Sequence, residues 1–297
     1  MATAFCPAHI TGFFKAELDK KDSKQLGSLG AGFSIQKGVK TTVTIRNKTK
    51  HDISNFTIKV NGFESGDMRV SEAVLSKFST EEKFVDVIHE IDVPVGYGFG
   101  SSAAVALSLS IALNDALECK LSKIKVAQIA HDVEIECKTG LGDVLASYYG
   151  GFEIRDKPGA PGIGHVQNIT LNKISIIMIC FSPISTSKFI KERLPRINGL
   201  GGKMVNELLK SKNYEHFQEM SLEFAKYVDV MTPRMQKVVN ELSKNNIKCG
   251  IALFGETIFS MIPKENENKI LKILEKYSDG IIIKSELDNT GARVLYN

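Results

Sequence analysis

The chain has 297 residues, of which 43% are hydrophobic and 24% charged, and its formal net charge is +4. These proportions are close to those of globular proteins in general, so the chain can bury a sizeable core. Lys and Arg are spread along the sequence without a block of like charge, which argues against a nucleic-acid-binding arm. The longest wholly apolar run, Ile176–Phe181, is far shorter than a membrane span.

Five cysteines are scattered through the sequence, and no two of them form a C-x-x-C pair. Their odd number and irregular spacing favour neither a disulfide framework nor a zinc ribbon. We therefore expect them to be core thiols. We also expect a cytoplasmic protein, because the N-terminus lacks the basic and apolar segments of a signal peptide.

The N-terminal half is predicted to begin with strands. Apolar and polar residues alternate at Thr41–Arg46 and at Phe56–Val60, where β-branched side chains also favour strands. Gly27–Gly38 holds four glycines in twelve positions and is expected to be a loop and turn between strands. From Ile91 a short extended stretch should lead to Pro94 and a glycine-rich loop.

Two helices are predicted after that loop. Ser101–Glu118 is rich in Ala and Leu, with no glycine or proline, and is typical of a buried helix. A second helix should follow with Ser122 as its N-cap and should end before Gly140. The segment 157–164, KPGAPGIG, contains two prolines and three glycines, and we predict the domain boundary there.

Beyond the boundary the pattern predicts an apolar strand at Lys173–Phe181 and a helix that begins at Thr232-Pro233 with an N-cap and an N-terminal proline. The remaining expected elements are three strands and a helix, at Gly250–Phe254, Thr257–Ile262, Gly280–Ile283 and Glu265–Ser278. The chain is therefore predicted to be α+β, with domains at residues 1–160 and 161–297 and a cleft between them.

The strongest local signal is the glycine loop that precedes the first long helix. Alternate glycines let the backbone turn sharply and leave its N–H groups open, and the helix N-terminus behind them favours an anion. The serines at the junction can offer hydroxyls to a phosphate or a metal ion. This pattern predicts a phosphate site without a Walker lysine, built from Pro94, Gly96, Gly98, Gly100, Ser101, Ser102 and Ala103.

Two other interpretations fit parts of the same pattern. Gly98 to Ala103 also matches the loose dinucleotide fingerprint G-x-G-x-x-A, with Glu118 near the spacing of a ribose contact. A dinucleotide fold needs a strand before that acid, whereas Glu118 ends a predicted helix and a second helix follows. The third interpretation is a tight turn that caps a core helix.

Residues 94–104 resemble the second motif of the superfamily that includes galactokinase, homoserine kinase, mevalonate kinase and phosphomevalonate kinase. The family pattern is P-x-G-x-G-L-G-S-S-A, and Phe99 in place of leucine is the single departure. Gly150-Gly151 follows Asp143 by seven residues, as a Gly-Gly pair follows the aspartate of mevalonate kinase-like members. The resemblance implies a two-domain kinase fold with a strand-rich N-terminal ATP-binding domain, a ferredoxin-like C-terminal domain and an active site between them.

Within the superfamily the N-terminal half is most similar to the archaeal pantoate kinases. Four segments carry this resemblance: Cys6–Phe14, Gly27–Gly32, Thr139–Asp143 and Gly150–Arg155. Mevalonate kinase-like members place a catalytic lysine two residues after the first-motif proline, where this chain has His9. In the C-terminal half the glycine-rich third motif is reduced to Gly255, so the sequence leaves a phosphate contact there open.

The resemblance and the residue chemistry together assign roles to two carboxylates. Asp143, in a turn between glycines, is expected to orient the substrate hydroxyl as a general base or anchor. Glu134 and Ser102 are expected to hold phosphate-bound Mg²⁺. Asp143 as a backbone-capping turn residue and Glu134 as a solvated partner of Lys138 remain the alternatives.

Substrate binding is expected from four further residues. Arg155 can hold a carboxylate bidentately, as recognition of pantoate requires. His131 shares a helix face with Glu134, Ser28 lies in the glycine-rich stretch, and His9 occupies the position of the lysine. Arg155, His131 and Ser28 each have an ordinary structural alternative, as a solvated arginine, a half-buried helix histidine and a turn serine; if the chemistry is shared, the role of the lysine replaced by His9 is absent or filled by another residue.

We therefore expect an enzyme that uses ATP and Mg²⁺ to phosphorylate the 4-hydroxyl of pantoate in coenzyme A biosynthesis. The alternatives are a related kinase of mevalonate or homoserine, a non-catalytic binding module of the same fold, and a nicotinamide-dependent oxidoreductase. The sequence leaves the oligomeric state open, a homodimer included.

Overall fold

The computed structural model describes residues 1–63, 66–80, 82–184 and 186–296. Its strands are β1 (Ala2–Glu17), β2 (Gly27–Asn47), β3 (Phe56–Gly62), β4 (Lys83–Ile91), β5 (Phe152–Lys157), β6 (His165–Ile169), β7 (Ile174–Pro183), β8 (Gly250–Ala252), β9 (Gly255–Pro263), β10 (Ile281–Glu286) and β11 (Arg293–Leu295). Its α-helices are α1 (Arg69–Leu75), α2 (Ser101–Ala116), α3 (Lys123–Cys137), α4 (Asp143–Tyr149), α5 (Thr186–Ser211), α6 (Tyr214–Tyr227), α7 (Pro233–Lys244) and α8 (Glu267–Leu274).

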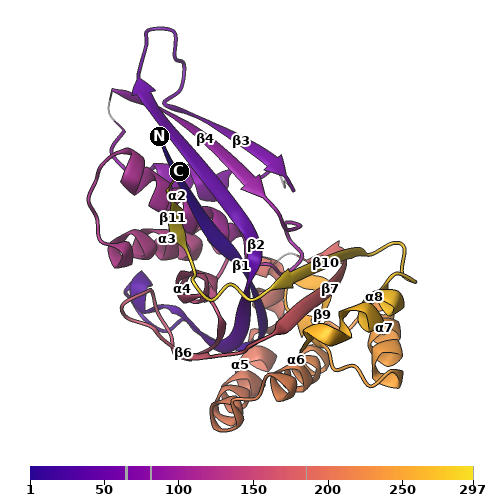
Figure 1. Ribbon diagram of the computed structural model, residues 1–297. Helices are drawn as coiled ribbons and strands as arrows, with labels where there is room; N and C mark the ends of the chain where they lie inside the picture. The colour runs from indigo at the N-terminus through magenta and orange to yellow at the C-terminus, as the bar shows by residue number, and fades with distance from the viewer. Residues whose placement is uncertain (64–65, 81, 185, 297) are drawn as a thin grey trace.

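A sheet of seven strands among the described residues forms the larger part of the molecule. Its strands run in the order β11-β1-β2-β4-β3, and β5 also pairs with β2 and carries β6 at its edge. The long β2 is therefore shared: its first half pairs with β5, and its second half pairs with β4. Figure 1 shows α2, α3 and α4 together on one side of these strands.

The prediction of a loop at Gly27–Gly38 is wrong, because this segment is the first half of β2. Its glycines mark places where neighbouring groups come close, a use that glycine also has within strands. A Cβ on Gly38 would lie 2.2 Å from the carbonyl oxygen of Cys6, and one on Gly32 would lie 2.3 Å from that of Ile10.

The second sheet, formed by four of the described strands in the order β10-β7-β9-β8, has antiparallel neighbours throughout. Taken in chain order, its strands lie in the sequence 4-1-3-2, with helices between the first and second and between the third and fourth. This is the ferredoxin-like arrangement that was predicted for the C-terminal part.

Phenylalanines join the two sheets into one core. Phe33 on β2 and Phe152 on β5 are paired neighbours that point to the same face of the first sheet. Phe33 lies 5.0 Å from Phe259 of β9, and Phe152 lies 5.0 Å from Phe217 of α6, measured between ring centroids. Because side chains alternate along a strand, the opposite face of β2 and β5 is left for other residues.

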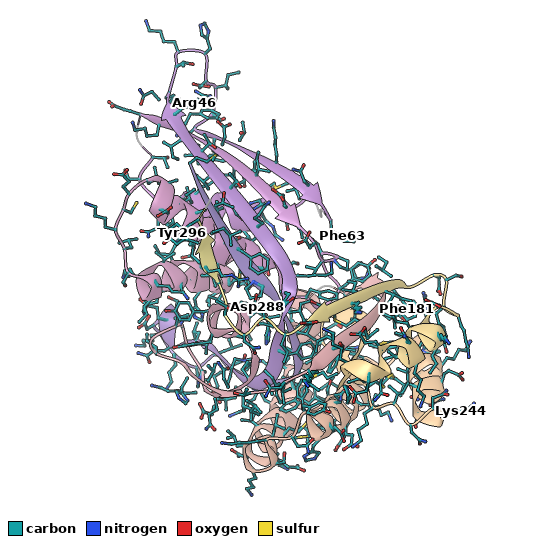
Figure 2. All side chains as sticks on the ribbon, in the orientation of Figure 1. Arg46, Phe63, Phe181, Lys244, Asp288 and Tyr296 are labelled. Carbon is teal, nitrogen blue, oxygen red and sulfur yellow. The ribbon has the colours of Figure 1, made fainter. Side chains whose placement is uncertain are left out.

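The C-terminal segment ties the second sheet back to the first. After β10 the chain returns to pair β11 with β1, so that the two termini lie close together in Figure 1, and Asp288 lies at this junction in Figure 2. The C-terminal segment passes close to Gly150 and Gly151, and at Gly150 there is no room for a side chain: a Cβ there would lie 2.6 Å from the Asp288 carbonyl oxygen.

The domain division at residues 160 and 161 stays a prediction. Strands β6 and β11, on its C-terminal side, belong to the first sheet.

Other elements follow the sequence signals closely. The predicted helix at Ser101–Glu118 ends two residues early, and Ser122 caps α3 by accepting a hydrogen bond from Lys125 N–H. Thr232 caps α7 in the same way.

The prediction of core thiols is wrong for Cys119, which is exposed, and Cys137 is half-buried. In the part of the chain described, no helix is long and apolar enough to cross a membrane.

Helix α5 supplies a test of this packing. A Cβ on Gly201 would lie 1.9 Å from the carbonyl oxygen of Phe14 on β1, whereas one on Gly202 would meet the flexible Lys15 side chain at 3.1 Å. We expect Gly201→Ala to lower the free energy of unfolding by about 1–3 kcal/mol, because the helix must move away from the strand. The control Gly202→Ala should be neutral or stabilise by up to about 1 kcal/mol through helix propensity. Equal unfolding curves in denaturant for the two variants would contradict this packing.

Candidate active site

The glycine loop has the backbone conformation that its sequence predicts. Gly96, Gly98 and Gly100 all have positive φ, at 86°, 86° and 56°, a region that other residues rarely adopt. Helix α2 begins directly after Gly100, and none of the described side chains caps it. Its first N–H groups are therefore open to an anion. Helix α3 follows α2, so the strand required by the dinucleotide interpretation does not occur between them in this fully described stretch.

Gly255 supports this loop from the second sheet. A Cβ on Gly255 would lie 2.0 Å from the carbonyl oxygen of Tyr97, and that oxygen also accepts a hydrogen bond from Thr257 Oγ1 at 2.8 Å. A Cβ on Gly98 would in turn lie 2.5 Å from the carbonyl oxygen of Leu253. The reduced third motif therefore packs against the backbone of the glycine loop.

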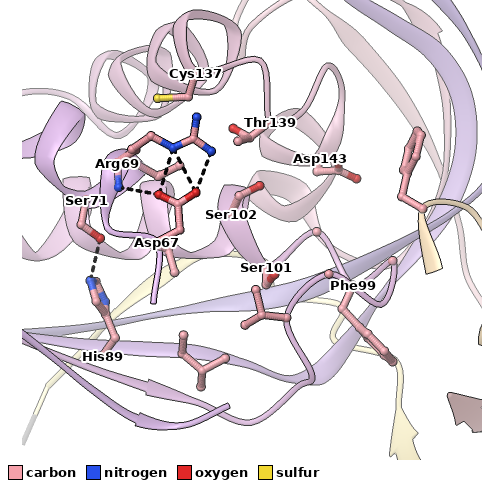
Figure 3. A pocket seen from close by; sticks show the side chains of 18 of the residues that line it. Asp67, Arg69, Ser71, His89, Phe99, Ser101, Ser102, Cys137, Thr139 and Asp143 are labelled. Atoms are coloured by element: carbon pink, nitrogen blue, oxygen red, sulfur yellow. Dashed lines mark hydrogen bonds and ion pairs between the residues drawn. The ribbon is translucent and has the colours of Figure 1, made fainter. Parts of the chain in front are cut away.

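A pocket of about 320 Å³ opens in front of the loop. It is bordered by the start of α2, the ion pair Asp67–Arg69 at the start of α1, and the turn between α3 and α4. Figure 3 shows Ser102 and Asp143 along the wall of the pocket. The pocket combines N–H groups at a helix N-terminus with hydroxyls and carboxylates, which suits a phosphorylated ligand that carries a cation.

Glu134 is buried beside the pocket, at 2% exposure. Its carboxylate accepts hydrogen bonds from Ser102 Oγ at 3.2 Å and Thr139 Oγ1 at 2.5 Å. Burial raises the pKa of Glu134 to about 7, and the nearby charge of Asp143 acts in the same direction. The alternative of a solvated pair with Lys138 does not fit this burial.

The pair Ser102 and Glu134 fits a divalent cation that phosphate groups also hold. The described residues contain no cluster of three or more His, Cys, Asp or Glu that could hold a metal ion unaided. A magnesium ion is commonly bound by one or two carboxylates together with substrate phosphates and water. A cation here would also relieve the repulsion between buried Glu134 and the partly exposed Asp143.

Asp143 occupies the first position of α4 and lies between two pockets. It lines the large pocket and also a small one of about 10 Å³, which Ser28 and Arg155 line as well. A Cβ on Gly100 would lie 3.3 Å from Asp143 Cβ, so the glycine loop reaches this acid directly. The side chain keeps 18% exposure. Asp143 therefore borders both cavities.

His9, on β1, is wholly buried and has a carboxylate at each ring nitrogen. Nδ1 lies 2.8 Å from Asp143 Oδ1, and Nε2 lies 2.9 Å from Glu153 Oε1. Burial alone would lower the pKa of His9, but the hydrogen bonds to Asp143 and Glu153 raise it overall. Burial would raise the pKa of Asp143, but the hydrogen bond from His9 and then the charges of His9 and Arg155 hold it below the ordinary value.

Arg155 extends this chain of charges on the side of the small pocket. Its Nη1 lies 2.5 Å from Glu153 Oε1, and its side chain is 1% exposed. Its Nε is buried without a hydrogen-bond partner among the described residues. The Cβ position of Gly142 would lie 2.9 Å from this Nε and 2.4 Å from Ser28 Oγ, so both polar groups border the same space.

The structure does not bring His131 to this site. It is buried on α3, its Nε2 lies 3.1 Å from the Ser23 carbonyl oxygen, and burial lowers the pKa of its ring. It lines neither pocket described above. Of the other predicted residues, His9, Ser28, Ser102, Glu134, Asp143 and Arg155 converge around the turn between α3 and α4.

Glu153 and Thr139 were not predicted from the sequence, although both contact predicted residues. Glu153 lies two positions before Arg155, which places the two side chains on one face of β5. That spacing is the signal that could have identified Glu153. Thr139 follows the end of α3, and its hydroxyl gave no signal that distinguishes it from other turn threonines.

Comparisons with known proteins match this geometry. Residues 68–151 match the family model described as GHMP kinases N terminal domain. The chain is 33% identical over 276 residues to the pantoate kinase of Methanocaldococcus jannaschii, covering 91% of this chain and 96% of that protein. It is 30% identical to the pantoate kinase of Thermococcus kodakarensis, with 91% of each chain covered. The chain belongs to the pantoate kinase family.

A solved structure agrees over the whole length. A phosphotransferase related to the coenzyme A biosynthesis pathway superimposes with a TM-score of 0.88 at 28% identity, covering 98% of this chain and 97% of that one. The two-domain kinase fold predicted from the sequence is thereby confirmed. The glycine loop lies within the segment that matches the family model.

Gly98 gives a test of the loop as a nucleotide site. We expect Gly98→Ala to reduce the rise in melting temperature that ATP and Mg²⁺ produce, because the new Cβ strains a positive-φ position and displaces the loop from Leu253. Gly66→Ala is a suitable control, since it also has positive φ, at 72°, but has open space around its Cβ. An undiminished ATP-induced shift in Gly98→Ala would contradict a role for this loop in nucleotide binding.

Proposed function

We propose that this protein is an ATP-dependent kinase that phosphorylates the 4-hydroxyl of pantoate. The proposal rests on the position of Asp143. This residue lines the pocket at the N-terminus of α2, where phosphate is proposed to bind, and also the small pocket lined by Arg155 and Ser28. Membership of the pantoate kinase family supports the choice of substrate. The cytoplasmic location expected from the sequence belongs to the same proposal.

In this proposal the glycine loop and the first turn of α2 bind the phosphates of ATP, and Ser102 and Glu134 hold Mg²⁺. The metal ion, when bound, neutralises charge on the phosphoryl groups. The loop supplies backbone N–H groups, which favour an anion without a lysine side chain. Glu134, anchored by Thr139, supplies a carboxylate whose position is fixed before the ligand arrives.

Asp143 orients the acceptor hydroxyl for attack on the γ-phosphorus. A new bond forms between the hydroxyl oxygen and phosphorus, and the bond from phosphorus to the bridging oxygen breaks, with its electron pair leaving on ADP. The hydroxyl proton passes to Asp143. Because the pKa of Asp143 is held low, the carboxylate acts mainly by orientation and accepts the proton late in the transfer.

In this proposal Arg155 and Ser28 bind the carboxylate of pantoate. The unpartnered Nε of Arg155 is a buried donor, and such donors are rarely left unsatisfied in a native protein. A carboxylate would accept from Nε and from Ser28 Oγ once the small pocket, about 10 Å³ here, had widened to receive it. Glu153 already holds Nη1 of the same guanidinium, so the fork is fixed in place before substrate binds.

Substrate choice is tested by measuring ADP release with pantoate, mevalonate, homoserine and galactose as acceptors. We expect kcat/KM for pantoate to exceed the others by about 100-fold, because mevalonate and homoserine also carry a carboxylate and a hydroxyl but lack the 2-hydroxyl and the paired methyl groups of pantoate. Equal or greater values with mevalonate or homoserine would reject pantoate as the substrate. ATP-induced stabilisation without turnover of any acceptor would instead favour the binding-module alternative.

The metal site is tested by Glu134→Gln. We expect kcat to fall by about 100-fold or more, because charge on the transferring phosphoryl group would lose part of its neutralisation. Glu136→Gln on the same helix is a matched control, since Glu136 is exposed and paired with Lys77 at 2.7 Å. Near wild-type turnover in folded Glu134→Gln, at limiting Mg²⁺ as well as in excess, would reject Glu134 as a metal ligand.

The acceptor site is tested by Asp143→Asn, which keeps the size of the side chain but removes its charge. We expect kcat to fall by about 100- to 10,000-fold, while binding of ATP, measured by calorimetry, stays within about threefold of wild type. Asp143 would be excluded from the chemistry if this variant retained its kcat.

A further inference from the structure

The surroundings of His9 determine how many protons its ring carries. A neutral imidazole has one N–H group, so only one of its nitrogens can donate a hydrogen bond. Carboxylate oxygens of Asp143 and Glu153 lie 2.8 Å and 2.9 Å from the two nitrogens. With a neutral ring and both carboxylates ionised, one of these contacts would place two lone pairs against each other. An imidazolium ring donates at both.

The charges that face His9 lead to the same assignment. Helix α4 presents Asp143, and β5 presents Glu153 and Arg155, whose Nη1 is 3.4 Å from Nε2 of His9. With His9 neutral, this buried group would carry a net negative charge, whereas with His9 protonated its charges balance. A buried charge is costly unless it is compensated by a partner.

Two further described neighbours of His9, Thr11 and Gly32, carry no charge. Thr11 Oγ1 lies 3.4 Å from Nδ1, and β2 presents Gly32, whose Cβ position would lie 2.5 Å from Nε2. The backbone N–H of His9 donates to the Phe99 carbonyl oxygen at 3.0 Å, immediately before Gly100. Thus His9 is fixed by the glycine loop through its backbone and by both carboxylates through its ring.

We propose that His9 is a positioning residue, held as an imidazolium by Glu153, that keeps Asp143 ionised and fixes its carboxylate beside the phosphate site. The proposal rests on the function proposed above, in which Asp143 receives the acceptor hydroxyl. Oδ1 of Asp143 is bonded to His9, and Oδ2 accepts no hydrogen bond from the described residues, so Oδ2 is the oxygen left for the hydroxyl.

The proposal makes activity depend on the proton of His9. Since the folded pKa of His9 is raised above its ordinary value of 6.5, the charged form persists through that pH and is lost as the pH rises through the folded pKa. The rate constant kcat should therefore fall on the alkaline side of its pH profile. Removing the charge of Glu153 should lower the pKa of His9 and move this fall to lower pH.

The charge state is tested directly by NMR on the full chain labelled with ¹⁵N in its histidine rings, without substrate. At about pH 7.5 we expect both ring nitrogens of His9 to be protonated. His89 is an internal control, because it is equally buried but bonded to the hydroxyls of Thr41 and Ser71, and burial lowers its pKa to about 4. His9→Asn assigns the signals.

A His9 ring that is neutral at this pH would overturn the proposal. Because this measurement needs neither ATP nor pantoate, its outcome is independent of whether pantoate is the substrate. It also does not depend on the folding of any variant that alters Glu153.

The kinetic test uses Glu153→Gln and follows kcat against pH with saturating pantoate and ATP. We expect the alkaline fall in kcat to move to lower pH, whereas the control Glu90→Gln, at an exposed pair with Lys40, should leave it in place. A loss of kcat in Glu153→Gln that is uniform over pH would assign Glu153 a purely structural role and contradict the proposal. If this variant does not fold, the NMR titration of the wild-type ring decides.

Discussion

The site depends on the space that β2 leaves at Gly30 and Gly32. These two residues lie on the same face of the strand, opposite Arg155 and Glu153 of β5. On the other side, β1 contributes His9 and Thr11 to the same face, and Thr11 pairs directly with Gly32. Side chains of β1 and β5 can therefore meet across an intervening strand, which ordinary residues would prevent. A Cβ on Gly30 would lie 2.5 Å from Arg155 Nη2.

The opposite face of the same strands carries the aromatic core, so a single stretch of sheet separates apolar packing from buried charge. Phe33 lies between Gly32 and Ser34, and Phe152 precedes Glu153. This alternation lets the second sheet pack on one side while the polar chain from Arg155 to Asp143 forms on the other. The two parts of the molecule thus meet at the strands that carry His9, Glu153 and Arg155, and Gly255 packs against the glycine loop from the second sheet.

Local chemistry explains which features were predictable from the sequence. The glycine loop, the cap at Ser122 and the proline-started helix at Pro233 are each determined within a few residues, and all three were predicted. The glycines of β2 led to a wrong prediction because closely spaced glycines occur both in loops and in closely packed strands. Their role depends on the side chains of the neighbouring strands β1 and β5. Glu153 was not predicted because its partner His9 is 144 residues away in sequence, although its other partner, Arg155, lies two positions along the same strand. His131 lies three residues before Glu134 on the predicted helix, which suggested that both side chains enter one pocket. Its ring contacts the Ser23 carbonyl oxygen and does not enter that pocket.

In the function proposed above, Asp143 directs the γ-phosphate of ATP to the 4-hydroxyl of pantoate and not to water. The most direct measurement is ³¹P NMR of the products from excess pantoate and limiting ATP. We expect one phosphomonoester for each ADP formed, with the phosphate on the 4-hydroxyl and with inorganic phosphate at the level of a sample without enzyme. Release of inorganic phosphate in step with ADP, and no phosphorylated pantoate, would contradict it.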